Sequence, residues 1–579
     1  MKEARFMIVT LLIWSLVFLV SFSYGFFIIK LINNEEKLYP HISTPSSIIP
    51  VFFVGFIFCY VLASILTFFM PLGGFAFLII LIPALILLIK NAMIKQLLSA
   101  SKSGSLGINP LLFVTITTVL LVYTLWLTAG EVQNSDTYIY HAQSIHWIEK
   151  YPVITGLGNF FNRLAYNSGW FVQNALFSFS FLNDQSFHVL NGLIIFSVSL
   201  FFILEFLQAI NKNEVGLVQV WGMLIIPIGL NTIGAQASAP STDMPVAYLA
   251  WMAAYLCMQY QPNEKPLKPL FIVTGIIAFA FTIKISIAPL MLLPAIFFFT
   301  KLKAFNLRKV LFLVLWVAAI MVPWLMRNVF ISGYAVYPSA STALPVEWRI
   351  PTELVEQDAL GIRAFGFYER APTEEVMSRQ ILDRLKFWYY NLTPSQKGIF
   401  LVSLFQPVIL GALAIYPIIK KRVKPVLLVP LTIVTYYGAF LFWLFVSPNL
   451  RFGYVYLLFL FTMCLSAGIV LCFTLLKPSS KTIGYFGSIG VIVIISLFFV
   501  RSFNLNEFKM RYLLPLDYDH RSTQPCLINE GRTTILCAAE YGECGYHPFP
   551  CHAWGNEYVR MRSTQFSDGF YLDWPRDDP

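Results

Sequence analysis

The chain has 579 residues, of which 57% are hydrophobic and only 12% are charged. A water-soluble domain carries about 25% charged residues, so this composition excludes a soluble globular protein and predicts a polytopic membrane protein. The net charge of +10 does not indicate a nucleic-acid partner, because the basic residues cluster in short connections between apolar runs. The partner that the composition requires is a lipid bilayer.

Apolar runs of about 20 residues predict membrane-spanning helices, and the chain contains about fourteen. They cover 6–29, 49–69, 73–89, 110–129, 188–209, 216–233, 243–260, 269–283, 285–300, 309–326, 398–418, 425–446, 452–475 and 482–500. The first run is too long for a cleavable signal peptide and is followed by no small-residue cleavage site. We therefore expect an all-α bundle of about fourteen spans.

The distribution of basic residues predicts the orientation of the bundle. Lys and Arg gather in connections that are separated from one another by two spans, so they share one face, at 90–102, 212, 265–268, 301–309, 420–424 and 477–481. The short connections 70–72 and 234–242 on the other face carry no Lys or Arg. The positive-inside rule makes the first face cytoplasmic. The polar regions 130–187, 327–397 and 501–579 are then expected outside, the second as a small cap of short helices.

Four cysteines, Cys526, Cys537, Cys544 and Cys551, lie in the polar C-terminal tail. An even set in a loop-rich segment is typical of disulfides, which need an oxidising compartment. A zinc site is the alternative, but the spacing lacks a paired Cys-x-x-Cys. Four cysteines allow three connectivities, and we prefer Cys526–Cys537 with Cys544–Cys551 because short loops close most readily. The tail should be an extracytoplasmic, disulfide-stapled lobe of short strands and turns.

The segment that follows the apolar run 110–129 is the most informative of the chain. It places Glu131 and Asp136 at the mouth of a predicted span, where charged groups are functional candidates. Apolar residues then recur at three- and four-residue spacing, which predicts an amphipathic helix over 136–149 in the membrane interface. Ser135 would be its N-cap, and Asp136 as a simple helix-start residue is the alternative. On an α-helix His141 would not share the face of Asp136.

The next segment, 156–170, is rich in glycine, amide and aromatic residues and suits the binding of a polar ring compound. We assign His141, Trp147, Asn167 and Trp170 as candidate acceptor- or sugar-binding residues.

Charged residues far apart in sequence fall at predicted outer helix ends. Besides Asp136 these are Asp243, Lys284, Arg327 and Arg451, which suggests a shared outward-facing cavity. Asp136 could act as general base on a hydroxyl, and Asp243 could orient the acceptor or complete a Mg or Mn site with Asp136. The three cations could neutralise a phosphate leaving group. Snorkelling side chains at the interface are the alternative for the cations.

These features together resemble the GT-C superfamily of integral-membrane glycosyltransferases. The resemblance lies in an acid just past a span, a following interfacial helix, a later Asp at an outer helix start, and the Pro-x-x-Arg-Phe motif at 448–452. The stretch 136–170 is more closely similar to an uncharacterised group of bacterial GT-C-like polytopic membrane proteins. That group also has a Cys-containing outer tail with Asp-Gly-Phe near its end, here Asp568 to Phe570.

The resemblance implies a GT-C-like core over 110–500, preceded by additional helices in 1–109 and followed by the tail 501–579. It implies a glycosyltransferase that takes a sugar from a polyprenyl-phosphate donor and passes it to a glycan or lipid-linked acceptor of the cell envelope. The site would lie on the outer face of a bacterial cytoplasmic membrane. GT-C enzymes often carry paired acids in the first outer loop, and here only Glu131 could be the second, which leaves metal dependence open.

Two other functional classes remain as alternatives. A transporter or flippase should place acids or broken helices at the bilayer midplane and show related halves. A polysaccharide polymerase or ligase shares the donor class but should have an Arg-dominated outer loop without an early Asp.

Overall fold

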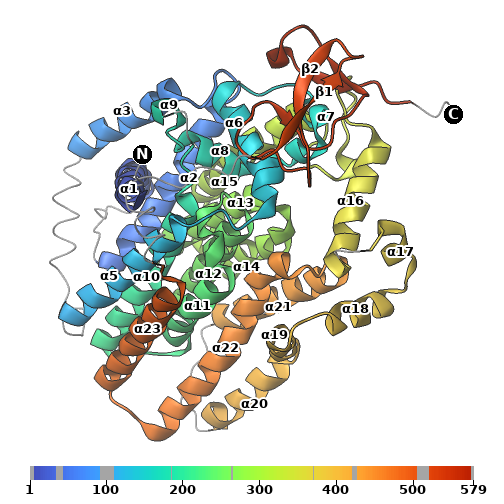
Figure 1. The fold of residues 1–579 in the computed structure, drawn as a ribbon. Helices are drawn as coiled ribbons and strands as arrows, with labels where there is room; N and C mark the ends of the chain where they lie inside the picture. The colour runs from blue at the N-terminus through green and yellow to red at the C-terminus, as the bar shows by residue number, and fades with distance from the viewer. Residues whose placement is uncertain are drawn as a thin grey trace.

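The computed structural model describes residues 6–33, 44–90, 110–183, 186–261, 265–368, 371–419, 427–504 and 521–575. They form a helical bundle with a small β lobe at one end (Figure 1). Parts of two predicted basic connections, 91–109 and 420–426, and the stretch 505–520 of the tail lie outside the described residues.

Nine of the described helices are long and apolar enough to cross a membrane, so the chain is a multi-pass membrane protein. They are α1 (Phe6–Asn33), α2 (Ile48–Leu66), α5 (Pro110–Thr128), α10 (Leu190–Lys212), α11 (Leu217–Ile233) with the 3-10 turn η5 (Gly234–Ser238) that continues it, α15 (Leu307–Ser332), α21 (Leu428–Val446), α22 (Leu450–Leu476) and α23 (Ser480–Ser502). A tenth span is formed if α19 (Pro394–Leu404) and α20 (Gln406–Ile419), which meet at an angle of 60°, count as one.

The predicted number of fourteen full spans is not confirmed. Four of the predicted runs form helices shorter than 18 residues, namely α3 (Gly74–Lys90), α12 (Asp243–Gln259), α13 (Leu267–Ile283) and α14 (Leu292–Thr300). The run 269–300 is divided at Lys284, whose backbone is extended (φ −152°, ψ 120°), and continues as the 3-10 segment η6 (Ile285–Met291). This break places a charged side chain between two apolar helices.

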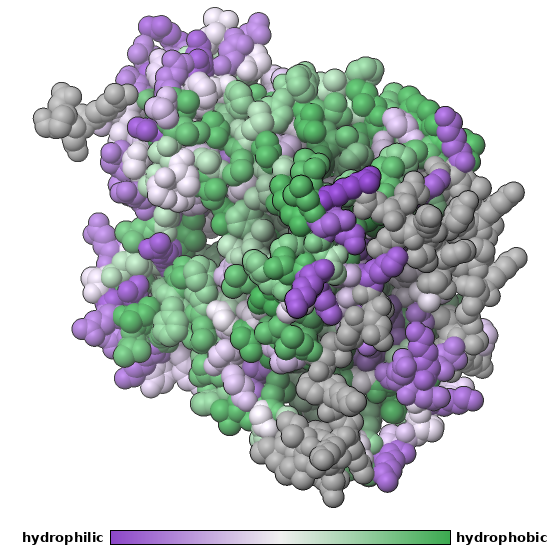
Figure 2. Space-filling model, turned by 180° about the vertical axis from the view of Figure 1, so that it is seen from behind, coloured by the Kyte–Doolittle hydropathy of each residue, from purple (hydrophilic) through white to green (hydrophobic). Residues whose placement is uncertain are grey.

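The membrane-embedded helices share one hydrophobic core. Its centre is α12, which packs against α10, α13, α21 and α22 and buries the rings of Trp251 and Tyr255 completely. Helix α2 packs against α13 and α15, so the N-terminal helices are part of the same core. The outer surface of α15 exposes Leu307, Leu311 and Val314. Figure 2 shows a broad apolar surface over the helices, with hydrophilic residues over the β lobe at one end and again toward the opposite end.

Short helices cover the end of the bundle beside the β lobe. From the first outer region these are η3 (Thr137–His141), α6 (Ala142–Lys150), α7 (Leu157–Phe160), α8 (Gly169–Leu176) and α9 (Ser180–Asn183). From the second they are α16 (Thr352–Phe367), α17 (Thr373–Ser378) and α18 (Ile381–Tyr390), which agrees with the expected cap of short helices.

The C-terminal lobe is built from short strands, as expected. Strands β1 (Thr523–Ile528) and β2 (Thr533–Ala538) pair antiparallel, β3 (Cys551–His552) runs parallel to β2, and β4 (Val559–Met561) pairs antiparallel with β5 (Phe570–Leu572). The disulfides Cys526–Cys537 and Cys544–Cys551 are present, which confirms the preferred connectivity. A second hydrophobic core joins this lobe to the first outer region through residues such as Phe160, Ile535 and Phe570.

The helix expected over 136–149 differs from its prediction in two ways. It begins with a π-helical turn, η3, and its α-helical part is buried on all sides from Ala142 to Glu149. An interfacial helix would expose its polar face, but here the C-terminal lobe covers that face, because Gln143, His146 and Glu149 all contact residues 545–551.

Non-reducing peptide mapping tests the stapled lobe. We expect one peptide pair linked through Cys526 and Cys537 and a second linked through Cys544 and Cys551, because both pairs are bonded in the folded lobe. The buried Cys59 and Cys257 provide the control and should be alkylated only after denaturation. Four free thiols in the tail, or linked peptides that cross the two pairs, would contradict the structure.

Candidate active site

Four charged side chains from distant parts of the chain meet at helix ends on the side of the bundle that carries the C-terminal lobe. Arg451 Nη2 lies 2.9 Å from Asp136 Oδ2, and Arg451 Nε lies 4.0 Å from Asp243 Oδ2. Lys284 Nζ forms an ion pair with Asp243 Oδ1. The signs alternate in the order Asp136, Arg451, Asp243, Lys284, and we call this group the charge quartet.

Local backbone structure fixes each member of the quartet. Asn134 Oδ1 accepts a hydrogen bond from the backbone N–H of Asp136 at 3.0 Å, and Ser135, the expected N-cap, is exposed. Asp243 is the first residue of α12, where the helix dipole favours a negative charge. Asn449 caps α22 by accepting a hydrogen bond from the backbone N–H of Arg451 at 3.0 Å.

Lys284 is held at the break between α13 and η6. Its ammonium lies 4.0 Å from the centre of the Phe452 ring, a cation–π contact that adds to the ion pair with Asp243. Phe452, the residue after Arg451, therefore stabilises Lys284, the second cation of the quartet.

The two carboxylates differ in accessibility. The side chain of Asp136 is 28% exposed, whereas that of Asp243 is 7% exposed. Burial by itself would raise the pKa of Asp136, but the Arg451 guanidinium outweighs that effect and lowers it. Asp136 is therefore the acid that a ligand can reach, and it is ionised and paired at neutral pH.

His141 and Asp136 interact electrostatically, although α-helical spacing had placed them on different faces. Residues 137–141 are π-helical, so the five-residue separation does not carry the side chain to another face, and that part of the prediction was wrong. The imidazole is buried, with Nδ1 at 3.4 Å from Thr137 Oγ1. Burial lowers the pKa of His141 to about 4 against the opposing pull of the Asp136 and Asp243 carboxylates, so the ring is neutral at pH 7.

A second polar cluster lies beside the quartet and was not predicted. Asp358 on α16 accepts hydrogen bonds from the hydroxyls of Tyr166 (2.5 Å) and Tyr337 (2.9 Å), and it pairs with Arg163 Nη1 at 3.3 Å. Tyr140 stands between the two groups, since its phenol interacts with Asp136, Asp243 and Arg163. Arg163 belongs to a loop that the sequence singled out, but nothing in the sequence pairs it with an acid 195 residues later.

Arg327 does not join Lys284 and Arg451. Its Nε donates to Asn167 Oδ1 at 3.1 Å, and its side chain is buried. Among the described residues no ion pair links Arg327 to the quartet. Asn167 is in turn tied to the backbone carbonyl of Trp324, so this pair fastens the first outer loop to α15.

The other predicted site residues have structural surroundings. Trp147 is 2% exposed within the core that joins the C-terminal lobe, and Trp170 is fully buried with its indole N–H donating to Asn191 Oδ1. Both rings are therefore almost completely shielded from solvent. Glu131 is exposed, its backbone carbonyl accepts from Ser238 Oγ, and no described ion pair joins it to the quartet.

The residues present do not fit a Mg or Mn site. Asp136 and Asp243 are each paired with a cation of the chain itself. Within the described ranges, no group of three or more His, Cys, Asp or Glu side chains is arranged to hold a metal ion. A divalent ion would have to displace both Arg451 and Lys284.

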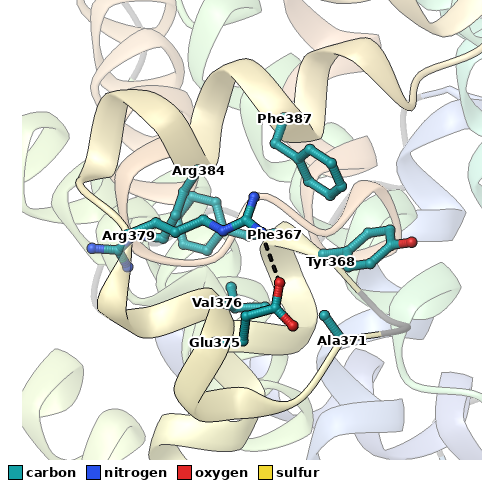
Figure 3. A pocket seen from close by; sticks show the side chains of 8 residues that line it. All are labelled: Phe367, Tyr368, Ala371, Glu375, Val376, Arg379, Arg384 and Phe387. Carbon is teal, nitrogen blue, oxygen red and sulfur yellow. Dashed lines mark hydrogen bonds and ion pairs between the residues drawn. The ribbon is translucent and has the colours of Figure 1, made fainter.

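An open pocket lies apart from the quartet, between α16, α17 and α18, with about 300 Å³ of empty space that includes open solvent (Figure 3). It is lined by Phe367, Tyr368, Ala371, Glu375, Val376, Arg379, Arg384 and Phe387. Glu375 and Arg379 pair across it at 2.7 Å, and its apolar walls form the small core of the cap. The contacts among these lining residues hold the cap helices together.

The lowered pKa of Asp136 makes a prediction about stability and pH. Because the pKa is lower in the folded state, the Asp136–Arg451 pair stabilises the fold at pH values above the ordinary carboxyl pKa of about 3.9. That contribution is lost as the pH falls through the lowered pKa. The difference in unfolding temperature between wild type and Asp136→Asn should be largest at neutral pH and shrink in acid. Glu131→Gln is the matched control, and a difference that stays constant with pH would contradict the pairing.

Comparison with known families assigns most of the chain to one family. Residues 7–458 match a family described as a domain of unknown function, DUF8201, and this range holds every member of the charge quartet. Comparison with curated proteins and with solved structures found no match. Over well more than half of its length, the chain thus belongs to the DUF8201 family.

Proposed function

We propose that this protein is a GT-C-type glycosyltransferase that uses a polyprenyl-phosphate-linked sugar. The acceptor would be a glycan or lipid-linked glycan of the cell envelope. The observation that carries the proposal is the charge quartet, because it sets two cations and an accessible carboxylate at helix ends of an apolar bundle. A substrate with a lipid tail and a phosphate head matches both parts of that arrangement.

Lys284 and Arg451 are the proposed phosphate ligands. Each is already paired with a carboxylate, so a donor phosphate would compete with Asp243 and Asp136 for the same cations. Arg451 is well suited to this exchange, since its planar guanidinium presents several N–H donors and reaches both acids. A charge-assisted hydrogen bond of this kind contributes about 1.5–3 kcal/mol.

Asp136 is the proposed general base, on the ground of its accessibility. It would take the proton of an acceptor hydroxyl while the acceptor oxygen bonds to the anomeric carbon of the sugar. The bond between that carbon and the phosphate oxygen breaks, and the phosphate leaves with the electron pair. Lys284 and Arg451 would stabilise the negative charge on the leaving phosphate. Asp243, which is nearly buried, would hold Lys284 and Arg451 in place.

The exchange of partners also activates the base. In the resting protein Arg451 keeps the pKa of Asp136 low, which suits an ion pair and not a base. When a phosphate draws Arg451 away and adds its own negative charge, the pKa of Asp136 should rise. Binding of the donor would thus raise the basicity of the carboxylate that deprotonates the acceptor hydroxyl.

Two observations support a site on the outer face of a bacterial cytoplasmic membrane. The disulfides of the C-terminal lobe require an oxidising compartment, and this lobe packs on the segment that carries Asp136. The basic connections that the structure describes, such as 265–268, 301–309 and 477–481, adjoin the helix ends opposite to those that carry the quartet, which agrees with the positive-inside rule.

Sugar transfer by single-residue variants tests the assignment of the base. Asp136→Asn keeps the size of the side chain and removes the base, so transfer should fall by about 10²–10⁴. Glu131→Gln, an exposed acid outside the quartet, is the control and should transfer normally. If Asp136→Asn transfers normally at matched membrane levels while Asp243→Asn does not, the base is Asp243. If all three variants transfer sugar normally, the mechanism proposed here, with a carboxylate of the quartet as general base, is wrong.

The pH dependence of the rate tests the exchange of partners. The profile of kcat/KM reports the free enzyme, and that of kcat reports the enzyme with bound substrate. The acid limb of kcat/KM should therefore have the lower midpoint, because Arg451 still holds Asp136 in the free enzyme. In Asp136→Asn the acid limb should disappear from both profiles or shift its midpoint, because the carboxylate that titrates is gone. Coinciding midpoints in the wild type would show that the phosphate does not replace Asp136 on Arg451.

A further inference from the structure

The π-helical turn after Asp136 leaves one backbone carbonyl free of its usual partner. In an α-helix the carbonyl of Tyr138 would accept from the N–H of Ala142, but that N–H donates to the carbonyl of Thr137. The Tyr138 carbonyl instead accepts from the backbone N–H groups of Cys544 and Gly545, at 2.9 and 2.8 Å. Gly545 has a φ of +71°, a conformation that favours glycine. The Cys544–Cys551 loop thus completes the hydrogen bonding of the turn.

Gln143 fixes the same loop one turn further along. Its buried side-chain amide donates to the carbonyls of Gly545 (3.0 Å) and Pro548 (2.9 Å) and accepts from the N–H of Cys551 at 3.3 Å. A single side chain of α6 therefore holds both ends of the loop that the disulfide closes.

The rest of the polar face of α6 is also bound to this loop. The His146 ring stacks between the rings of Tyr546 and Phe549, with centroid distances of 4.2 and 4.1 Å. The Tyr546 hydroxyl donates to Glu149 Oε2 at 2.6 Å. Burial raises the pKa of Glu149, so the carboxyl depends on such partners. The contacts continue from Tyr138 to Glu149, along the whole helix that starts beside Asp136.

We propose that the loop closed by Cys544–Cys551 is a positioning device for Asp136, with Gln143 as its main anchor. It would set the depth and rotation of the π-helical turn and so the distance between the Asp136 carboxylate and Arg451. This loop lies beyond the family-matched residues 7–458, so a site built within that range is completed by the tail. The inference rests on the proposed function only for the role of Asp136 as base.

The two disulfides offer a matched experiment. The test variant is Cys544→Ser with Cys551→Ser, and the control is Cys526→Ser with Cys537→Ser, which opens the β1–β2 pair of the same lobe. A second test variant, Gln143→Leu, keeps both disulfides and the buried volume. Amide hydrogen exchange over 137–146 should be about tenfold faster in both test variants, because hydrogen bonds that protect the turn are lost, and unchanged in the control. This measurement needs no substrate.

The pH dependence of kcat/KM supplies a second readout, which a purely structural role of the loop would leave unchanged. In both test variants the acid-limb midpoint of kcat/KM should rise toward the ordinary carboxyl range, since Asp136 would lie farther from Arg451. In the control the midpoint should stay in place. The proposal is overturned if Gln143→Leu leaves exchange and midpoint unchanged, or if both disulfide variants behave alike. If neither the wild type nor any variant transfers sugar, the glycosyltransferase proposal fails. The positioning role is then decided by the hydrogen-exchange result alone.

Discussion

The position of Arg451 between Asp136 and Asp243 is the interaction on which the end of the molecule beside the C-terminal lobe depends. Charges that leave bulk water are tolerated only when each has a partner, and removing one partner leaves the other uncompensated. The quartet meets this requirement with residues from four segments. It thereby links the loop after α5, the start of α12, the break after α13 and the start of α22. A ligand that carries a phosphate is the kind of group that can enter such an arrangement by replacing one anion with another.

The surroundings of the quartet restrict how it can move. On one side, Arg163, Tyr166 and Tyr337 converge on Asp358 and tie the first outer loop to the cap helix α16. On the other side, Asn167 and Arg327 fasten the same loop to α15. The C-terminal lobe covers the helix that follows Asp136. Asp136 is therefore carried by a short segment that is held from several directions, as a group that must meet a small reacting centre requires.

The sequence predicted those features that depend on composition or on spacing within a short stretch. Long apolar runs indicated the membrane-embedded bundle, and short loops between cysteines predicted both disulfides. The placement of Asp243 and Arg451 beside helix starts followed from the runs that adjoin them. The break at Lys284 was predicted, but the number of full spans was too high because composition does not reveal how an apolar run is divided. The run 285–300, for example, forms the 3-10 segment η6 and the nine-residue helix α14.

Features that depend on contacts between distant segments could not be read from the sequence. A π-helical turn has no composition of its own, so the position of His141 was misjudged. The polar face of α6 looked like a water-facing surface, because nothing local shows that residues 545–551 will cover it. Trp147 and Trp170 suggested a sugar-binding surface because they are aromatic residues, yet both rings are buried. Arg327 lies near the end of α15, where a phosphate ligand was predicted, but its side chain binds Asn167 instead.

Binding of a polyprenyl phosphate without a sugar, measured on the purified protein in lipid nanodiscs, tests the central claim most directly. Arg451→Gln and Lys284→Gln should each weaken binding by at least about tenfold, because each removes a charge-assisted contact to the phosphate. Lys309→Gln, at the opposite end of the bundle, should bind like the wild type. The corresponding polyprenyl alcohol should bind weakly to all of them. Equal binding of the phosphate by wild type, Arg451→Gln and Lys284→Gln would contradict the account, since the quartet would then not be where the lipid phosphate is held.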